Sequence, residues 1–299
     1  MKHHQGRACI LCVYLLMILL CFPAGSSSAS AKYVLNWMTF GQIPAYIPTG
    51  EFKNQGFIDK TIRMLHKKAL TDIEPQFFQV NHNRFNLIAV QKGNCYVGWK
   101  TFEDQRVFST PIFIWYPSGI LIHKRNQAIF GPEGSILSLK ELLENKELTL
   151  GVIDAFAYSP EIQRLLTAYR GADHIYSMKS STMQVNLKML TGRRIDYTIG
   201  WPSQPMVEEK LNHLDNEFLF YNVEEDQNYL YVGVSCSDCE QGRQIIDRVN
   251  TLFADREVLL EVMSNIRQWV VMSEQHEKLY KQTILEKKPH PKVIHMTYP

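Results

Sequence analysis

Short apolar stretches alternate with amphipathic ones along most of the chain, and this alternation constrains the fold more than any other feature of the sequence. The short stretches are rich in β-branched and aromatic residues, which is typical of strands. Between them, apolar residues recur at helical spacing, as at Ile58, Ile62 and Leu65. Strands that alternate with helices predict an α/β protein. The predicted strands are residues 33–37, 76–80, 96–99, 112–116, 119–123, 148–153, 195–201, 217–221 and 229–235.

Two helix starts can be placed from their capping residues. Ser138 stands three positions before Glu141 at the start of an apolar run, which predicts a capping box and a short helix. Ser159 precedes Pro160, a residue favoured in the first turn of a helix, and a buried apolar stripe begins at Ile162. Further helices are predicted near residues 184–190, 244–253 and 257–270.

The first 31 residues have the three parts of a secretory signal: a basic start, an apolar core at residues 10–22 and an exit of small residues. The alternative is a membrane anchor, but the apolar run of about a dozen residues is shorter than the roughly 20 that span a bilayer. We therefore expect cleavage after Ala31 and export to the periplasm. The 268 residues that remain (299 minus 31) are enough for two lobes.

Composition and charge exclude several classes of function. With 45% hydrophobic and 11% aromatic residues, the chain has the profile of a globular protein. The leader carries two of the 32 basic residues and none of the 30 acidic ones, so the remainder has 30 of each sign, which gives no support to a nucleic-acid partner. The sequence contains no glycine-rich phosphate loop, no His-Glu-x-x-His and no Gly-x-Ser-x-Gly. We expect no catalytic residue, metal site or cofactor.

Removal of the leader leaves three cysteines, Cys95, Cys236 and Cys239, in an oxidising compartment. The simplest arrangement is a structural disulfide from Cys95 to Cys236, with Cys239 as the alternative partner. A redox Cys-x-x-Cys site at residues 236–239 is a further alternative, because a thiol at the start of a helix has a lowered pKa. Zinc would need additional ligands at a suitable spacing, and none is near in the sequence.

Four segments together resemble the bacterial extracellular solute-binding proteins of family 3. The resemblance spans nearly all of the chain after the leader, and it lies in the order and spacing of the segments. They are residues 43–46 (Ile-Pro-Ala-Tyr) with 55–59, Lys100-Thr101 with 108–111 (Phe-Ser-Thr-Pro), 138–143 with 148–153, and 192–200 with Asp196. A poorly characterised subgroup without an assigned ligand is more similar still, through Lys100-Thr101, the stretch from Ile195 to Gly200 with Trp201-Pro202, and Cys236.

The resemblance implies a two-lobed type II periplasmic-binding-protein fold, in which each lobe is a mixed sheet flanked by helices and the ligand binds in a cleft between them. Residues 32–115 and 222–299 would form the first lobe, and residues 116–221 the second. Such clefts suit anions where a helix begins, because free backbone N–H groups and the helix dipole favour negative charge there. Residues 155–159 would form that cradle, with Ser159 both capping the helix and donating to the ligand.

The sequence departs from the amino-acid binders of the family at two positions. Their ligand-carboxylate arginine lies three residues after the threonine that matches Thr101, and that position is Asp104 here; Arg106 either takes over its role or faces solvent. Their second-lobe acid, which pairs with the ligand ammonium, matches Gly200. An unpaired buried ammonium is costly, so an anionic or aromatic solute fits better than a standard α-amino acid.

Aromatic residues near strand ends supply the remaining candidate contacts, because aromatic rings hold ligands by stacking and apolar burial. Each of them could instead belong to the core. The candidate ligand contacts are Trp37, Tyr46, Lys100, Thr101, Arg106, Phe156, Tyr158, Ser159 and Trp201.

These features together predict a monomeric periplasmic solute-binding protein that captures a small molecule by hinge closure and delivers it to an ABC-type permease. One alternative is a periplasmic partner of a membrane sensor, with or without a ligand of its own. Another is a dehydratase-like enzyme on the same fold, with Glu103 or Asp104 transferring a proton, although the sequence offers no paired base.

Overall fold

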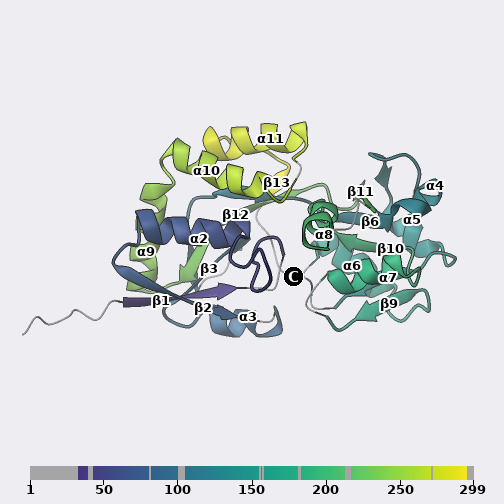
Figure 1. Cartoon of the computed structure of the whole chain (residues 1–299), viewed down its shortest axis with the longest axis horizontal. Helices are drawn as coiled ribbons and strands as arrows, with labels where there is room; N and C mark the ends of the chain where they lie inside the picture. The colour runs from purple at the N-terminus through teal and green to yellow at the C-terminus, as the bar shows by residue number, and fades with distance from the viewer. Residues whose placement is uncertain are drawn as a thin grey trace, which may run out of the picture. The chain divides into compact units, whose positions relative to one another are not determined.

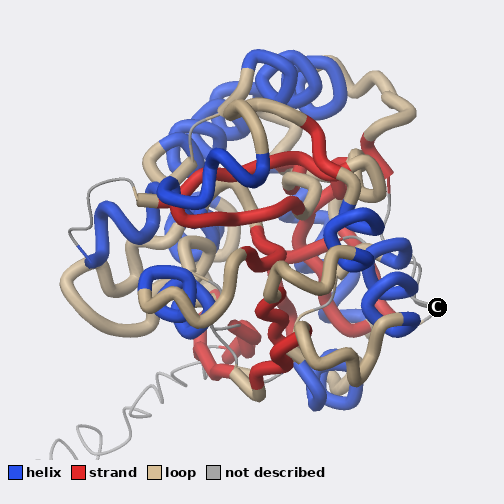
Figure 2. Tube along the Cα trace, turned by 90° about the vertical axis from the view of Figure 1, so that its right-hand side faces the viewer, coloured by secondary structure: helices blue, strands red, loops and turns tan. Residues whose placement is uncertain are grey.

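Two β-sheets organise the chain, and helices flank both of them (Figures 1 and 2). The computed structural model describes residues 33–39, 43–80, 82–99, 105–154, 156, 158–180, 183–212, 217–270 and 272–294. The predicted leader and its cleavage site, together with Lys100, Thr101 and Asp104, lie outside these residues.

The seven-stranded sheet has the order β13-β12-β3-β1-β2, and β4 and β5 also pair with β12. β1 runs parallel to β3, whereas β12 runs antiparallel to β3, β4 and β5. Its strands are β1 (Tyr33–Thr39), β2 (Ile73–Gln79), β3 (Asn94–Trp99), β4 (Arg106–Phe108), β5 (Phe113–Trp115), β12 (Tyr229–Ser237) and β13 (Val293–Ile294).

The six-stranded sheet has the order β7-β11-β6-β10-β8-β9. β6 pairs antiparallel with β10 and β11, and the other pairs are parallel, so this sheet is also mixed. Its strands are β6 (Gly119–His123), β7 (Ile136–Leu137), β8 (Leu150–Ile153), β9 (Ile175–Met178), β10 (Tyr197–Gly200) and β11 (Phe218–Val223).

Helices cover the sheets through apolar faces, as in α2, where Phe57, Ile58, Ile62 and Leu65 are buried. Beside the seven-stranded sheet, α2 packs on α9 and α10, and these contact β12 and β5 (Figure 1). The helices of this part are α2 (Phe57–Lys68), α3 (His82–Ala89), α9 (Glu240–Leu252), α10 (Arg256–Arg267), α11 (Glu274–Tyr280) and the π-helical η2 (Lys281–Leu285). We call each sheet together with its helices the seven-stranded part and the six-stranded part. The helices of the six-stranded part are η1 (Lys124–Asn126), α4 (Gln127–Phe130), α5 (Leu139–Glu144), α6 (Pro160–Ala168), α7 (Gln184–Thr191) and α8 (Gln204–Asn212).

Only two segments of described chain lead from one sheet to the other. Residues 116–118 connect β5 to β6, and residues 224–228 connect β11 to β12. We call these the first and the second crossover. Every other strand is followed in the chain by elements that stay with its own sheet.

The disulfide lies within the seven-stranded sheet. Cys95 of β3 and Cys236 of β12 stand directly opposite each other in the antiparallel register, and their sulfur atoms are bonded. Cys239 is the free cysteine, so the bridge from Cys95 to Cys236 is confirmed and the alternative through Cys239 is wrong.

The nine predicted strands and the predicted helices are present in the structure, with ends that differ by a few residues. β4, β7, β9 and β13 were not predicted; β7 and β13 are only two residues long, and β9 lies at a sheet edge with Tyr176 exposed. No helix in the described ranges has the length and apolarity to cross a bilayer, and no metal-ligand cluster occurs among the same residues.

Candidate functional site

A cavity of about 260 Å³ lies where elements of both sheets and both crossovers meet. The start of β12 forms one wall, because the register places Trp99 opposite Val232 and Trp115 opposite Leu230. The six-stranded part contributes the start of α6 and the residue that follows β10. The cavity is lined by Trp99, Trp115, Tyr116, Ser159, Pro160, Glu161, Trp201, Glu225, Asp226, Asn228, Leu230 and Ile294.

Three of the five tryptophans of the chain line this cavity. The rings of Trp115 and Trp201 meet edge to face, with centroids 6.2 Å apart and an interplanar angle of 75°. The ring of Phe156 packs against that of Trp201, with ring centroids 5.5 Å apart. Tyr116 follows Trp115 in the chain and lies in the first crossover. Trp115 lies in β5 of the seven-stranded sheet and Trp201 directly follows β10 of the six-stranded sheet, so their contact connects the two sheets at the cavity.

Asp226 is the most buried carboxylate of the lining, with 6% of its surface exposed. One of its oxygens accepts a hydrogen bond of 2.9 Å from the backbone N–H of Ser118. Burial raises the pKa of Asp226 to about 6, although hydrogen bonds from Ser118 and the backbone of Asn228, together with the nearby Ser159 hydroxyl, act in the opposite direction. The carboxylate therefore sits in a site where its charge is only partly stabilised.

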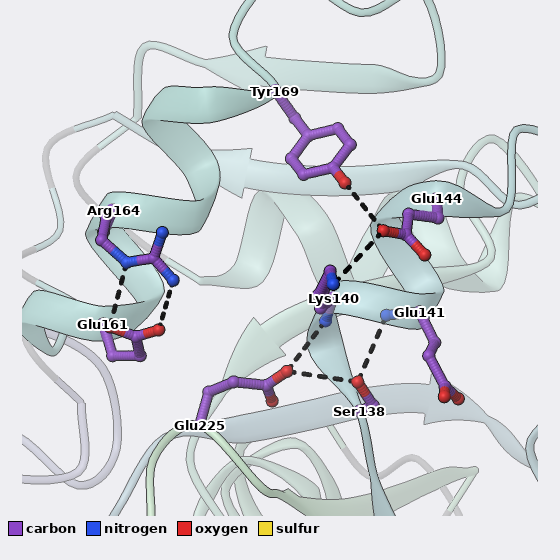
Figure 3. A network of polar contacts seen from close by, with 8 residues as sticks. All are labelled: Ser138, Lys140, Glu141, Glu144, Glu161, Arg164, Tyr169 and Glu225. Carbon is purple, nitrogen blue, oxygen red and sulfur yellow. Dashed lines mark hydrogen bonds and ion pairs between the residues drawn. The ribbon is translucent and has the colours of Figure 1, made fainter.

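The other two acids of the lining already have partners (Figure 3). Glu225 accepts hydrogen bonds of 2.9 Å from the backbone N–H groups of Leu139 and Lys140, and one of 3.3 Å from Ser138, at the start of α5. The half-exposed Glu161 forms a 2.6 Å ion pair with Arg164. Glu225 thus stabilises a helix start beside the second crossover, where free N–H groups need acceptors.

Of the two helix caps that the sequence predicts, the structure confirms one, at Ser138, and not the other, at Ser159. The Ser138 side chain accepts from the backbone N–H of Glu141 at 3.3 Å, which confirms it as the N-cap of α5. Ser159 is the N-cap residue of α6, but its side chain makes no capping hydrogen bond, so the prediction of a side-chain cap is wrong. Its hydroxyl has no hydrogen bond of ordinary geometry, yet it lies close enough to Asp226 to lower the pKa of that carboxyl.

Two more polar groups of the cavity lining are buried without a partner in the described part of the chain. They are the indole nitrogen Nε1 of Trp115 and the hydroxyl of Tyr116. Unsatisfied buried groups of this kind carry a free-energy cost, which a ligand or a rearrangement of the site would relieve.

Phe156 and Tyr158, predicted as ligand contacts, line a second, smaller cavity of about 130 Å³ in the six-stranded part. Asp154, Arg170 and Ser177 contribute polar groups to it. The hydroxyl of Tyr158 accepts a 3.1 Å hydrogen bond from the backbone N–H of Ile153, which fixes the ring against β8.

Tyr46 lines a third cavity, of about 330 Å³, together with Asp59, Arg63 and residues 77–79 of β2. Its hydroxyl donates to the carbonyl oxygen of Val97 at 3.3 Å. The nine candidate contacts are therefore not gathered at one place: Ser159 and Trp201 line the first cavity, Phe156 and Tyr158 the second, and Tyr46 the third.

Trp37 and Arg106 lie in the interior of the seven-stranded part and line none of these three cavities. Trp37 is fully buried and donates from its indole nitrogen to Nε2 of His66 at 2.7 Å. Arg106 is buried rather than facing solvent, which rules out one of the two sequence alternatives. Its guanidinium donates to Ser235 at 2.7 Å and to the carbonyl of Ala89, and it stacks on the ring of Tyr96.

Sequence reasoning missed Trp99, Trp115, Tyr116 and Asp226 as lining residues. The three aromatic residues do end the predicted strands 96–99 and 112–116, but strand ends are many. Trp99 and Trp115 are brought together because their strands both pair with β12, at Val232 and Leu230, which depends on strand order and register.

No protein-family model matches the sequence, and no curated protein matches it either. Several solved structures resemble it in three dimensions. The GluR0 ligand-binding core in complex with L-glutamate superposes with a TM-score of 0.56 at 11% identity, over 81% of this chain and 100% of that one. The substrate-binding protein of an amino acid ABC transporter gives a TM-score of 0.53 at 12% identity, over 79% and 98%. The probable amino-acid ABC transporter extracellular-binding protein ytmK from Bacillus subtilis gives 0.55 at 15%, over 80% and 99%.

At these identities the likeness concerns the fold. The chain has the two-lobed α/β fold of the type II periplasmic-binding proteins, with two mixed sheets flanked by helices, as the sequence predicts.

Proposed function

We propose that this chain is a periplasmic solute-binding protein that holds a small molecule in the 260 Å³ cavity and passes it to an ABC-type permease. The observation that carries the proposal is the composition of that cavity: three tryptophans, drawn from both sheets, converge beside both crossovers. A concave site that combines aromatic and other apolar side chains with several polar groups, as this lining does, is typical of small-molecule binding. Binding and release, rather than catalysis, are its task.

Of the anionic and aromatic solutes that the sequence favours, the aromatic class receives the support of the lining. The faces and edges of Trp99, Trp115 and Trp201 can pack against an aromatic body. An anionic group would have to be held at the start of α6, by Ser159 and its neighbours, or by Lys100 and Thr101, which directly follow Trp99 in the chain.

The proposed mechanism is a hinge closure about the two crossovers. The boundary predicted between residues 221 and 222 falls inside β11, so the moving parts are instead the residues that the crossovers separate: residues 119–223, and the residues before 116 together with those after 228. Closure is driven by contacts that the solute makes with both parts at once, since only differential contacts shift the equilibrium between open and closed forms. Trp201 and Ser159 would contribute such contacts from the second part, and Trp99 and Trp115 from the first.

A second candidate function is ligand sensing for a membrane receptor, in which the same closure is read by a partner instead of a permease. It is favoured by the likeness to the GluR0 ligand-binding core and to the AvGluR1 ligand-binding domain, which superposes with a TM-score of 0.55 at 15% identity. Both roles need the same occupied cavity and a monomeric binding unit, and they differ in the partner that follows.

Native mass spectrometry of the protein purified from its own periplasm tests the proposal directly. We expect a bound small molecule that is lost on denaturation. A thermal-shift panel of aromatic acids, amines, amino acids, dicarboxylates and short peptides should give a shift of several degrees for one class, because a ligand that binds only the folded state stabilises it. An empty protein with no shift across the panel would contradict the proposed function.

A further inference from the structure

The charged residues that line the 260 Å³ cavity are all acidic. Glu161, Glu225 and Asp226 contribute carboxylates, whereas none of the lining residues that the structure describes is a lysine, arginine or histidine. Glu161 is paired with Arg164, and Glu225 is occupied by the backbone of α5, so their charges are partly offset. An anionic ligand would meet this negative lining without an ion pair from the described residues.

Among the described residues the partners of Asp226 are all neutral, which distinguishes it from Glu161, whose partner is Arg164. It differs from Glu225, whose partners are also neutral, in its deeper burial. The groups that act on its carboxylate are the backbone N–H groups of Ser118 and Asn228 and the hydroxyls of Ser118 and Ser159. It is also the only one of the three that is almost fully buried. A buried carboxylate that lacks a cationic partner is stabilised by any positive charge brought next to it.

The tryptophans around Asp226 favour the same sign of charge. An indole ring carries negative potential on its faces and is the best aromatic partner for an organic cation, most of all where water is excluded. Trp115 and Trp201 are both largely buried, with 8% and 5% of their surfaces exposed, and their rings lie at 75° to each other. Both residues also line the cavity, so a guest held there would lie beside both indole rings.

The size of the cavity limits the guest to a small molecule. A volume of about 260 Å³ lies just below the range of roughly 300–1,000 Å³ that is usual for small-molecule pockets, so the cavity suits a small guest.

From these observations we infer that the solute is a small organic cation, an amine or alkylated ammonium ion on an apolar or aromatic body, with its charge next to Asp226 and its body against Trp115 and Trp201. The inference rests on the proposed function and deepens it by naming the class of solute. It also departs from the anionic solute that the sequence alone favours.

Isothermal titration calorimetry of the full chain after removal of its leader can separate charge from shape. The probes are phenethylamine, its neutral counterpart phenethyl alcohol, its acidic counterpart phenylacetate, and choline as a cation without a ring. We expect phenethylamine to bind at least about tenfold more tightly than phenethyl alcohol, and phenylacetate to bind more weakly than both.

Matched variants locate the charge and the rings. Asp226→Asn should weaken phenethylamine binding about tenfold or more, while phenethyl alcohol changes by less than about twofold. Trp201→Phe should weaken phenethylamine about three- to tenfold, since phenylalanine is the poorer cation partner. Trp37→Phe makes the same substitution outside the cavity and Glu141→Gln removes an exposed carboxylate, and neither should alter affinity. If Asp226→Asn does not fold, Glu161→Gln on the rim of the cavity replaces it, with an expected loss for cations only.

The inference and the proposed function fail in different ways. Binding of phenethyl alcohol or phenylacetate as tightly as phenethylamine, or a solute found by native mass spectrometry that carries no positive charge, overturns the cation inference and leaves a solute-binding protein. A protein that is empty after purification and binds none of the probes overturns both. Replacement of Lys100 by methionine serves as a further control: if it abolishes phenylacetate binding, the charge preference is anionic and the inference is wrong.

Discussion

The backbone N–H of Ser118 donates a 2.9 Å hydrogen bond to the carboxylate of Asp226, and this bond joins the first crossover to the second. The two segments are separated by more than a hundred residues in the sequence, yet they are the described connections between the two sheets. Asp226 lies in a tight turn that follows β11, where Val223 and Asp226 form a β-bridge. A single carboxylate thus connects the two crossovers and lines the 260 Å³ cavity.

Asp226→Asn is expected to stabilise the protein near neutral pH. Burial raises the pKa of Asp226 from 3.8 to about 6, so the folded state binds this proton more tightly than the unfolded chain. The ionised carboxylate therefore costs stability at every pH above about 6, and this cost disappears as the pH falls to about 4. Two units of pKa correspond to about 3 kcal/mol, and asparagine can still accept the bond from Ser118.

Urea unfolding of wild type and Asp226→Asn at pH 8, 6 and 4 measures this difference. The free energy of unfolding of the variant should exceed that of the wild type by up to about 3 kcal/mol at pH 8, and this difference should disappear near pH 4. Glu141→Gln, which removes an exposed carboxylate of α5, provides the control. A gap that stays constant with pH would show that the folded-state pKa of Asp226 is not raised.

Arg106→Lys is expected to destabilise the fold without changing solute affinity. The guanidinium of Arg106 is buried, donates to Ser235 and Ala89, and stacks on Tyr96. Lysine retains the charge but loses the planar fork and the stacking, which should cost about 2–4 kcal/mol. Chemical denaturation measures the cost, and calorimetry with whichever solute binds measures affinity. An unchanged stability with a tenfold loss of affinity would instead make Arg106 a ligand contact, as the sequence suggests.

Arg243→Lys is the matched control for that experiment. Arg243 is an exposed arginine that pairs with Asp238 at 2.7 Å, so its replacement should change neither the free energy of unfolding nor the solute affinity.

The cysteine arrangement predicts one free thiol per chain once the leader has been removed. Cys95 and Cys236 are bonded, so Ellman titration of the unfolded, unreduced protein should count Cys239 alone. Cys239→Ser should bring the count to zero. The disulfide spans 141 residues, and its loss in a Cys95→Ser, Cys236→Ser double variant should cost up to about 5 kcal/mol. Three reactive thiols in the wild type would refute the bridge and restore the redox alternative.

Most strands and helices of the fold could be predicted because each depends on a short stretch of sequence. The apolar run at residues 119–123 matches β6 from end to end, and the Ser138 cap opens α5 as expected. β9 escaped prediction because its sequence, Ile-Tyr-Ser-Met, belongs to an edge strand with exposed side chains and little periodicity. Strand existence follows from composition and period, whereas short edge strands exist only because a neighbour is available to pair with them.

The site was less predictable because its residues meet through topology. The sequence indicates Ser159 from its position at a helix start and Trp201 from its position at a strand end, and both line the cavity. Trp99 and Trp115 come together because β3 and β5 both pair with β12, which no local pattern indicates. Asp226 occupies a turn, where an isolated acid carries no signal of burial. Arg106 is the opposite case. Its side-chain chemistry suggests a ligand contact, but the structure buries it in the core, where it is hydrogen-bonded to Ser235.

Trp201→Ala is expected to destabilise the fold as well as weaken binding, so it is a poor probe of the site by itself. The ring is 5% exposed and packs against Trp115 and Phe156, and truncation of such a residue costs about 3–5 kcal/mol. Trp201→Phe keeps much of this packing and should cost less than half as much. Urea unfolding of the two variants checks the order. If alanine costs less than about 1 kcal/mol, Trp201 is not a packed residue in the absence of solute, and the contact between Trp115 and Trp201 does not hold the cavity together.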